Sequence, residues 1–299
     1  MLRRVKRPSI AIVGPGRLGT ALAISLRRSG YNIREIIARQ GSKSYASAKK
    51  LAREVGSLAS IPAVAVLDAD LVWFCVPDSM IVQAAREFSD RSWKGKVALH
   101  SSGVLPSDAL QVLRKRGANV ASAHPLMTFV HSLVPDLSGV LFAAEGDAAA
   151  LRVVRGIVRD LGGEMMVLRK QDKAAYHAFA TMICPLLLAL LASAEKVAGV
   201  AGITPNQARQ SMLPIIRKTL RNYSELGPAK SFTGPIIRGD SQTIGLHLDA
   251  LAQIPAARNA YVALTKAAIQ YLPSRNKHEI ETELLTAKSG KKSRKGRKV

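Results

Sequence analysis

Two histidines close apolar runs in the first half of the chain, and histidine is the side chain whose charge changes near neutral pH. His100 ends the run Val97–His100 and precedes Ser101-Ser102-Gly103, and His124 ends the run Val120–His124. An imidazole in such a place can donate or accept a proton in catalysis. A purely structural histidine fits either position equally well, and Ser-Ser-Gly is also an ordinary turn sequence.

A second group of polar side chains opens the long apolar stretch that follows residue 171. Lys173, His177 and Thr181 are spaced i, i+4 and i+8, so they share one face of a helix. This face is either the wall of a functional cleft or the solvated end of the helix. If it is catalytic, His177 is the first candidate for general acid and base. The alternatives are Tyr176, His124 and Lys173.

A glycine-rich turn is the third feature with a chemical meaning. The run Ser9–Val13 leads directly into Gly14, Pro15, Gly16, Arg17, Leu18 and Gly19. In a dinucleotide site the first glycine permits a tight turn and the second lets backbone N–H groups approach the pyrophosphate. The third lets the helix pack on the strand. Because a strand precedes this turn and a helix follows it, the motif predicts dinucleotide binding rather than a turn that binds nothing.

The end of the next apolar run indicates which dinucleotide binds. An NAD site usually carries Asp or Glu there, about 20 residues further on, for the ribose 2′-hydroxyl. Here the run Ile33–Arg39 ends in Arg39, followed by Ser42 and Lys43, while Glu35 lies too early in the run. A guanidinium can pair with a 2′-phosphate, which a carboxylate would repel. We therefore predict NADP; solvated loop charges are the alternative interpretation.

These residues require a sheet that positions them. Strand-like and helix-like segments alternate up to residue 168, which predicts an α/β fold with a doubly wound, mainly parallel sheet. Ligands bind such sheets beyond the carboxyl ends of the strands. Asp78 is also expected to cap the helix that follows it. The expected strands are 9–13, 33–39, 70–76, 97–100, 120–124, 140–144 and 165–168, and the expected cofactor contacts beyond the glycine turn are Arg39, Val76, Pro77, Asp78 and Ser101.

From residue 171 the pattern becomes helical. We expect helices at about 172–200, 205–224, 242–253 and 256–271, the second of them capped by Thr204. The predicted organisation is a dinucleotide-binding domain at 8–168, an all-α domain at 169–273 and a basic, disordered tail at 274–299.

The distribution of charge argues against two classes of function, specific nucleic-acid binding and insertion into a membrane. The formal net charge is +23, but seven basic residues and no acidic residue follow Thr286. That segment predicts a solubilising extension rather than a specific nucleic-acid site. The uncharged stretch 178–194 is short for a membrane span, so we expect the buried centre of the helical domain or a dimer interface.

The cysteines and histidines narrow the classes further. Cys75 and Cys184 lie in apolar segments, and the basic start of the chain leads straight into the first strand. Both observations predict a cytoplasmic protein with reduced thiols. The scattered histidines predict no metal site.

Two motifs give the first half a family resemblance. The glycine turn and Asp70–Asp78 resemble the Rossmann domains of pyrroline-5-carboxylate reductase, 6-phosphogluconate dehydrogenase and deazaflavin-dependent NADP oxidoreductases. Over residues 8–270 the chain is similar to a bacterial family of candidate oxidoreductases. That similarity rests on His100–Gly103, His124–Phe129, Phe142–Gly146, Tyr176-His177 and Thr233–Asp240.

The resemblance implies a Rossmann domain followed by a 6-phosphogluconate-dehydrogenase-like helical domain that forms a homodimer. The leading hypothesis is hydride transfer between NADP(H) and a small carbonyl or imine substrate in the cleft between the domains. The nicotinamide would supply the hydride, and the protein would supply orientation and a proton donor. The alternative is a non-catalytic NADP(H)-binding regulatory or scaffold protein.

Overall fold

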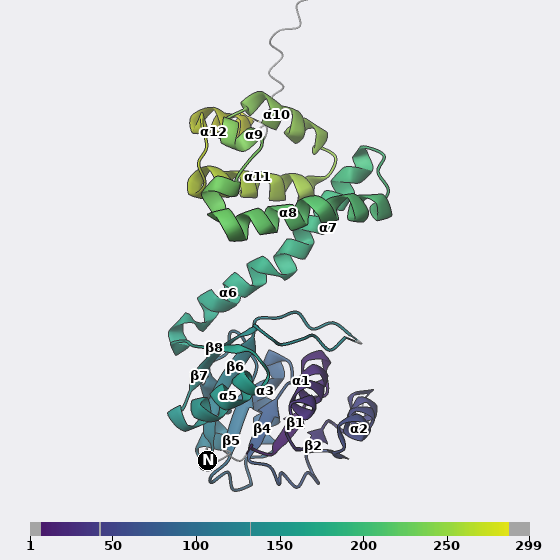
Figure 1. Ribbon diagram of the computed structural model, residues 1–299, viewed down its shortest axis with the longest axis vertical. Coiled ribbons are helices and arrows are strands. Elements are labelled where there is room, and N and C mark those ends of the chain that lie inside the picture. Colours follow the sequence, from purple (N-terminus) through teal and green to yellow (C-terminus); the bar gives the residue numbers. More distant parts are fainter. Residues whose placement is uncertain (1–6, 42, 132, 287–299) are drawn as a thin grey trace, which may run out of the picture. The chain divides into compact units, whose positions relative to one another are not determined.

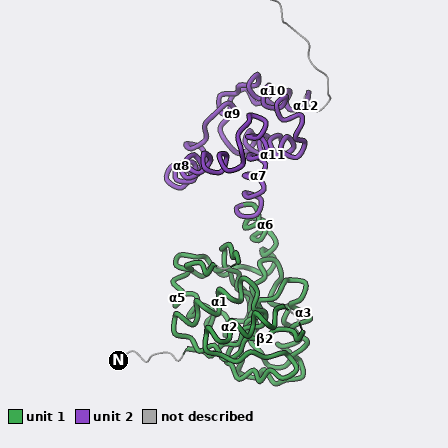
Figure 2. The backbone as a smooth tube through the Cα atoms, turned by 90° about the vertical axis from the view of Figure 1, so that its right-hand side faces the viewer, with its two compact units in different colours: residues 1–182 green, residues 183–299 purple. Residues whose placement is uncertain are grey.

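The structure is a computed structural model that describes residues 7–41, 43–131 and 133–286. The chain divides into two compact units, residues 1–182 and 183–299, which Figure 2 colours separately. This division lies beyond the predicted domain boundary at 168/169. The first unit extends further because helix α6 (Lys173–Ile183) buries Lys173, Tyr176 and Ala180.

The first unit is built on one eight-stranded sheet with the order β3-β2-β1-β4-β5-β6-β7-β8 (Figure 1). All neighbouring strands are parallel except β6 and β7, which run antiparallel. The predicted doubly wound, mainly parallel sheet is therefore confirmed. The strands are β1 Ile10–Val13, β2 Ile33–Ile37, β3 Leu58–Ser60, β4 Leu71–Phe74, β5 Val97–His100, β6 Asn119–Pro125, β7 Leu141–Gly146 and β8 Glu164–Val167.

Alternating side chains give the sheet two apolar faces. Ile10 and Ile12 of β1 join one core with helices α1, α2 and α5, whereas Ala11 and Val13 join the opposite core with α3 and α4. Burial on both faces explains why the central strands are almost wholly apolar. The helices of this unit are α1 Arg17–Arg28, α2 Lys43–Val55, α3 Asp78–Arg86, η1 Ser107–Leu110, α4 Gln111–Arg114, α5 Ala148–Asp160, η2 Lys170–Asp172 and α6.

Several sequence-based boundaries need correction. The edge strand β3 was not among the predicted strands, because it has only three residues and one of them, Leu58, is exposed. The single helix expected at 172–200 is two helices, α6 and α7 (Pro185–Val200), separated at Cys184. The break follows from Pro185, which disfavours a helical conformation at the preceding residue.

The second unit contains helices only. A small core joins α10, α11 and α12 through Ile244, Leu248, Val262, Ile280 and Leu284. Thr204 caps α8 with a capping box, as predicted. The helices after α7 are α8 Pro205–Ser231, α9 Pro235–Arg238, α10 Ser241–Ala250, α11 Pro255–Tyr271 and α12 Lys277–Thr286.

Helix α12 corrects the predicted tail. It occupies residues 277–286 of the segment expected to be disordered from 274 onward, and Ile280 and Leu284 hold it in the core. The sequence signal was this i, i+4 apolar pair. The remainder of the predicted tail lies outside the described residues.

The apolar segment 178–194 is also not the buried centre of a domain in this single chain. None of the residues of α7 is buried, and Leu186, Leu188 and Leu190 are exposed. Within the described ranges, residues 170–200 are the one helical stretch that is long and apolar enough to cross a membrane, by length and composition only.

Candidate active site

The glycine turn has the geometry that dinucleotide turns require. Gly14 has φ of +98°, and a Cβ atom there would lie 2.8 Å from the carbonyl oxygen of Cys75. A Cβ on Gly19 would lie 2.1 Å from the carbonyl oxygen of Gly14, so only glycine lets α1 start this close to β1. A Cβ on Gly16 would meet nothing within 4 Å. The space beside Gly16 is therefore open to a ligand.

The first turn of α1 presents positive charge to this space. Gly16 is the cap residue, Arg17 is the first helical residue, and the first turn contains no acidic side chain. The unpaired N–H groups of a helix N-terminus and the helix dipole favour an anion there. Pro15 is buried beneath the turn, and Leu18, Leu22 and Leu26 face the core as predicted.

A hollow continues from the glycine turn along the ends of β2 and β4. Arg39, Val76 and Pro77 line it together with Gly14 and Gly16. These predicted cofactor contacts are thus brought together. Ser44 of α2 also lines the hollow and was not predicted, while Ser42 lies outside the described residues.

Glu35 does not compete for the same ligand. Its carboxylate accepts hydrogen bonds from the Ser60 hydroxyl at 2.6 Å and from the backbone N–H groups of Val66 and Leu67 at 3.1 Å. The residue is buried. Its role is to close the loop after β3, in agreement with the expectation that it lies too early to reach a ribose.

The other two predicted cofactor contacts, Asp78 and Ser101, are not among the residues that line the hollow. Asp78 is the first residue of α3, and the cap position belongs to Pro77 with no side-chain hydrogen bond. The predicted capping role of Asp78 is therefore wrong. Ser101 is buried after β5, where its hydroxyl accepts a hydrogen bond from the Trp73 indole at 2.8 Å.

His100 holds the loop that follows β5. Its Nδ1 accepts a hydrogen bond from the Ser102 N–H, and its Nε2 lies 3.1 Å from the carbonyl oxygen of Pro106. This pairing requires a neutral ring with its proton on Nε2. Burial lowers the pKa of His100 to about 4, consistent with that state. His100 thus serves as a structural residue that fixes residues 101–106.

Lys173 is fully inside the protein, with 2% of its surface exposed. Its Nζ donates to the carbonyl oxygen of Ser102 at 3.0 Å and to the hydroxyl of Ser122 at 2.7 Å. Burial lowers the pKa of the Lys173 amine. The beginning of α6 is therefore anchored on the ends of β5 and β6 and is not a solvated helix end.

The remaining candidates meet around Gly103. The Tyr176 hydroxyl lies 2.9 Å from Nδ1 of His124, and the rings of His124 and His177 stand edge to face with centroids 5.8 Å apart. A Cβ on Gly103 would come within 2.4 Å of the His177 ring and 3.1 Å of the His124 ring. Both imidazoles therefore pack on the backbone of Gly103.

Burial sets the protonation of this pair. It lowers the pKa of His124 to about 4, with a further contribution from the nearby His177, and raises the pKa of Tyr176 to about 12. At neutral pH Tyr176 keeps its proton and can donate it to Nδ1 of neutral His124. The Nε2 of His124 then carries a proton on the side of Gly103.

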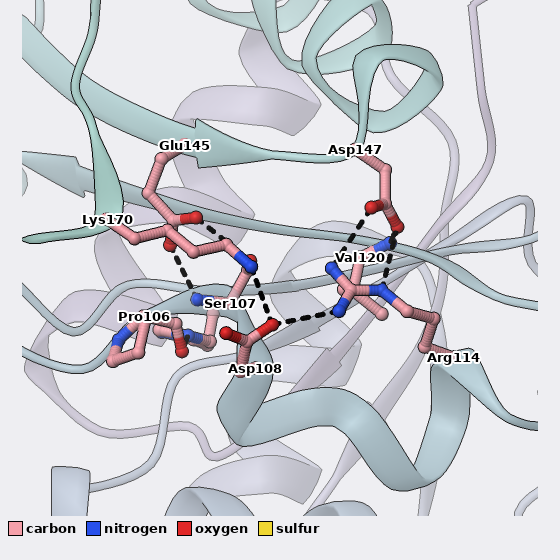
Figure 3. A network of polar contacts seen from close by, with 9 residues as sticks. Pro106, Ser107, Asp108, Arg114, Val120, Glu145, Asp147 and Lys170 are labelled. Carbon is pink, nitrogen blue, oxygen red and sulfur yellow. Dashed lines mark hydrogen bonds and ion pairs between the residues drawn. The ribbon is translucent and has the colours of Figure 1, made fainter.

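A buried carboxylate holds the end of the same loop. Glu145 of β7 is 2% exposed and accepts hydrogen bonds from the backbone N–H of Ser107 at 2.5 Å and from the Ser107 hydroxyl at 2.9 Å. Figure 3 shows this contact beside a second network in which Asp108 bridges Lys170 and Arg114. Hydrogen bonds from Lys170 and Arg114, reinforced by their charges, lower the pKa of Asp108.

Sequence reasoning assigned no site role to Ser122 or Glu145. Both lie within otherwise apolar strands, and a lone polar residue in such a strand was the available signal. Within the described ranges, no three His, Cys, Asp or Glu side chains come together as metal ligands.

Comparison with protein families and solved structures agrees with this architecture. Residues 2–125 match the model of a Rossmann-like domain, and residues 140–268 match a domain of unknown function, DUF2520. None of the curated proteins compared matches the chain.

Solved structures share the layout of both units. A candidate NADP oxidoreductase from Bacteroides fragilis is 25% identical, with a TM-score of 0.72 over 87% of this chain and 97% of that chain. An imine reductase from Myxococcus stipitatus, solved with NADP+, is 18% identical, with a TM-score of 0.62 over 93% and 100%. A pyrroline-5-carboxylate reductase from Coxiella burnetii is 13% identical, with a TM-score of 0.57 over 88% and 98%.

The two family matches and the shared layout agree with the predicted resemblance. The chain therefore combines a Rossmann-like domain with a following DUF2520 domain, and it shares the fold of the solved oxidoreductases named above.

Proposed function

We propose that this protein is an NADP(H)-dependent oxidoreductase that reduces, or in reverse oxidises, a small carbonyl or imine compound. The observation that carries the proposal is the composition of one sheet edge. The glycine turn of β1 and the cluster of Lys173, His124, Tyr176 and His177 both lie at the carboxyl ends of strands in the same unit. Ligands bind doubly wound sheets at this edge.

The residues at the glycine turn fit the pyrophosphate and ribose of NADP. The open space at Gly16 and the first turn of α1 suit the phosphates. Arg39 lies on the wall of the hollow where the predicted 2′-phosphate would be held, with Ser44 on the same wall. When bound, the nicotinamide supplies or accepts the hydride.

The polar cluster would manage the proton that accompanies hydride transfer. His177 is our first candidate for this role, because it is only half-buried whereas Lys173 is enclosed. Tyr176 and His124 are linked to each other, and their ring contact with His177 would orient it. Lys173 fixes Ser102, which precedes the glycine on which His177 packs.

Titration calorimetry with NADPH tests the first half of this proposal. We expect micromolar binding of NADPH, and the absence of any nucleotide binding would contradict the proposal. Oxidation of NADPH is then followed over a panel of small ketones, aldehydes and cyclic imines. We expect His177→Ala to lower turnover at least tenfold with unchanged NADPH affinity, and His247→Gln, in the second unit, to leave both unchanged.

The non-catalytic alternative has a distinct outcome in the same experiment. Tight NADPH binding without turnover of any compound in the panel favours a regulatory or scaffold role. The position of the substrate between the domains and the cytoplasmic location both stay predictions.

We also propose that two copies associate through the second unit. Besides the exposed leucines of α7, the neighbouring helix α8 exposes Leu213, Ile215 and Leu220. Apolar surface that a soluble protein leaves exposed in quantity commonly marks a contact with another protein. Light scattering should give twice the chain mass, and Leu188→Glu should yield monomers, whereas Thr219→Glu, an already polar position on α8, should not. A monomeric wild-type protein would contradict this.

A further inference from the structure

Two buried groups of opposite charge occupy neighbouring positions beneath the polar cluster. Glu145 and Lys173 are each 2% exposed. Burial of a lone charge is strongly unfavourable, so buried charges are normally paired or neutralised. The other buried acidic residue in the described chain, Glu35, accepts its hydrogen bonds from Ser60 and from the backbone of the loop after β3.

Strand register brings Glu145 close to the groups that hold Lys173. Glu145 of β7 is the direct cross-strand partner of Ser122 of β6. Directly opposite residues of an antiparallel pair point to the same face of the sheet. Ser122 is also the residue whose hydroxyl accepts the hydrogen bond from Nζ of Lys173. The carboxylate and the amine thus lie on the same face of the sheet, and Ser122 links them: it pairs with Glu145 across the strands and binds Lys173 through its hydroxyl.

The hydrogen bonds fix the roles of both groups. Both oxygens of Glu145 accept from Ser107, as an ionised carboxylate does. Lys173 donates to the Ser102 carbonyl, which also accepts from the Ser122 hydroxyl. The same short segment, Ser102-Gly103, therefore receives the amine of Lys173 and, one residue later, the ring of His177.

We propose that Glu145 is the charge partner that keeps Lys173 an ammonium group inside the protein, and that this pair positions His177 by fixing Ser102-Gly103. The two side chains act as positioning residues. Their coupling is independent of any nucleotide, and only the importance of His177 rests on the proposed function.

Other charged groups around Lys173 are weaker partners. Asp78 also favours the ammonium form, but it is exposed and its field is screened by water. The neighbouring imidazoles and phenol carry no negative charge at neutral pH. The titratable groups that interact with Lys173 in the described residues are Asp78 of α3, His100 of β5, His124 of β6 and Glu145 of β7, and its own helix α6 carries Tyr176 and His177 within the next turn.

Removal of the carboxylate charge tests the coupling in the full chain without ligand. Glu145→Gln keeps the shape but leaves Lys173 without its partner. We expect a larger fall in the melting midpoint at pH 7, where the amine is charged, than at pH 10, where more of it is neutral. Ser107→Ala removes a hydrogen bond to the same carboxylate without removing charge, so it should lower the midpoint equally at both pH values.

A double variant makes the test decisive. In a Lys173→Met background, Glu145→Gln should lower the midpoint at pH 7 less than it does in the wild type. Equal falls in the two backgrounds, or equal falls at the two pH values, would overturn the proposal. If Glu145→Gln alone is insoluble, a soluble double variant supports the coupling. An insoluble double variant beside soluble Lys173→Met contradicts it.

Hydrogen exchange measures the positioning step directly. At pH 7, Glu145→Gln and Lys173→Met should each raise exchange at least tenfold in peptides covering 100–108. Peptides covering the glycine turn, 8–28, should be unchanged. Unchanged exchange at 100–108 would show that the pair does not hold Ser102-Gly103. Because these experiments contain no NADP(H), their failure is distinguishable from failure of the proposed reductase activity.

Discussion

The two halves of the sheet's carboxyl edge are built in opposite ways. At β1, β2 and β4 the edge consists of backbone and open space: Gly14 and Gly19 allow close approach, and Gly16 faces nothing. At β5 and β6 the edge is filled by side chains: His100 and Lys173 hydrogen-bond to the backbone of residues 102–106, and His124 lies within hydrogen-bonding distance of Tyr176.

We call the part around Gly14, Gly16 and Gly19 the open half, and the part around His100, His124, Lys173 and Tyr176 the filled half. The open half requires glycines without a Cβ atom, so a substitution that adds a side chain there should damage it. The filled half depends on protonation states and mutual contacts, so changes of charge or of ring position should damage it.

Acid should damage the filled half most. The pKa values of His100 and His124 are about 4 in the folded chain, below the ordinary value of 6.5. The unfolded chain therefore binds protons between these values that the folded chain does not, so stability is full above pH 6.5 and falls toward pH 4. Each histidine should cost about 2 kcal/mol between pH 7 and 4.5.

Urea unfolding at the two pH values checks this expectation. His124→Gln should remove part of the acid loss, whereas His278→Gln on the exposed side of α12 should keep all of it. If His124→Gln loses as much unfolding free energy between pH 7 and 4.5 as the wild type does, protonation of His124 does not destabilise the fold.

An added methyl group should damage the open half in two distinguishable ways. Gly19→Ala forces a Cβ against the Gly14 carbonyl and should cost about 3 kcal/mol of folding free energy. Gly16→Ala meets no protein atom and should leave stability intact, yet it should weaken NADPH binding at least tenfold. Denaturation and calorimetry on both variants separate the effects. Full NADPH affinity in Gly16→Ala would contradict a phosphate site there.

A glycine-to-alanine change in the filled half should leave NADPH binding intact. Gly103→Ala brings a methyl group into the rings of His177 and His124, which can move aside, so the stability cost should stay near 1 kcal/mol. Displacement of His177 should lower turnover ten- to a hundredfold while the affinity for NADPH is kept. A loss of NADPH affinity instead would mean that the two halves are not separate.

The smallest expected effect lies at the tip of β2. Arg39→Ala should weaken NADPH binding about tenfold, which corresponds to about 1.4 kcal/mol for a charge-assisted contact. Binding of NADH should not change, because NADH has no 2′-phosphate. Lys50→Ala, an exposed cation further along α2, is the matched control and should leave both affinities unchanged. Equal losses for NADPH and NADH in Arg39→Ala would refute the 2′-phosphate assignment.

The fold class and the glycine turn follow from local patterns in the sequence. The turn Gly14–Gly19 and the apolar strands act through local conformation and periodicity, which neighbouring residues decide. Arg39 at the end of its run was likewise visible, because a strand tip follows from the strand. The resemblance to Rossmann oxidoreductases depended on these local motifs as well.

Which polar residues meet at the ends of β5 and β6 depends on tertiary contacts. His100 and His124 look alike in the sequence, yet one ring holds a loop and the other meets Tyr176, 52 residues away. Glu145 and Ser122 became neighbours through antiparallel pairing of β6 and β7, a break in an otherwise parallel pattern. Long-range register and burial produce such contacts, and no local pattern encodes them. The leucines of α7 are a second example: their composition predicts an apolar helix, but not whether that helix is buried. In the structure none of the residues of α7 is buried.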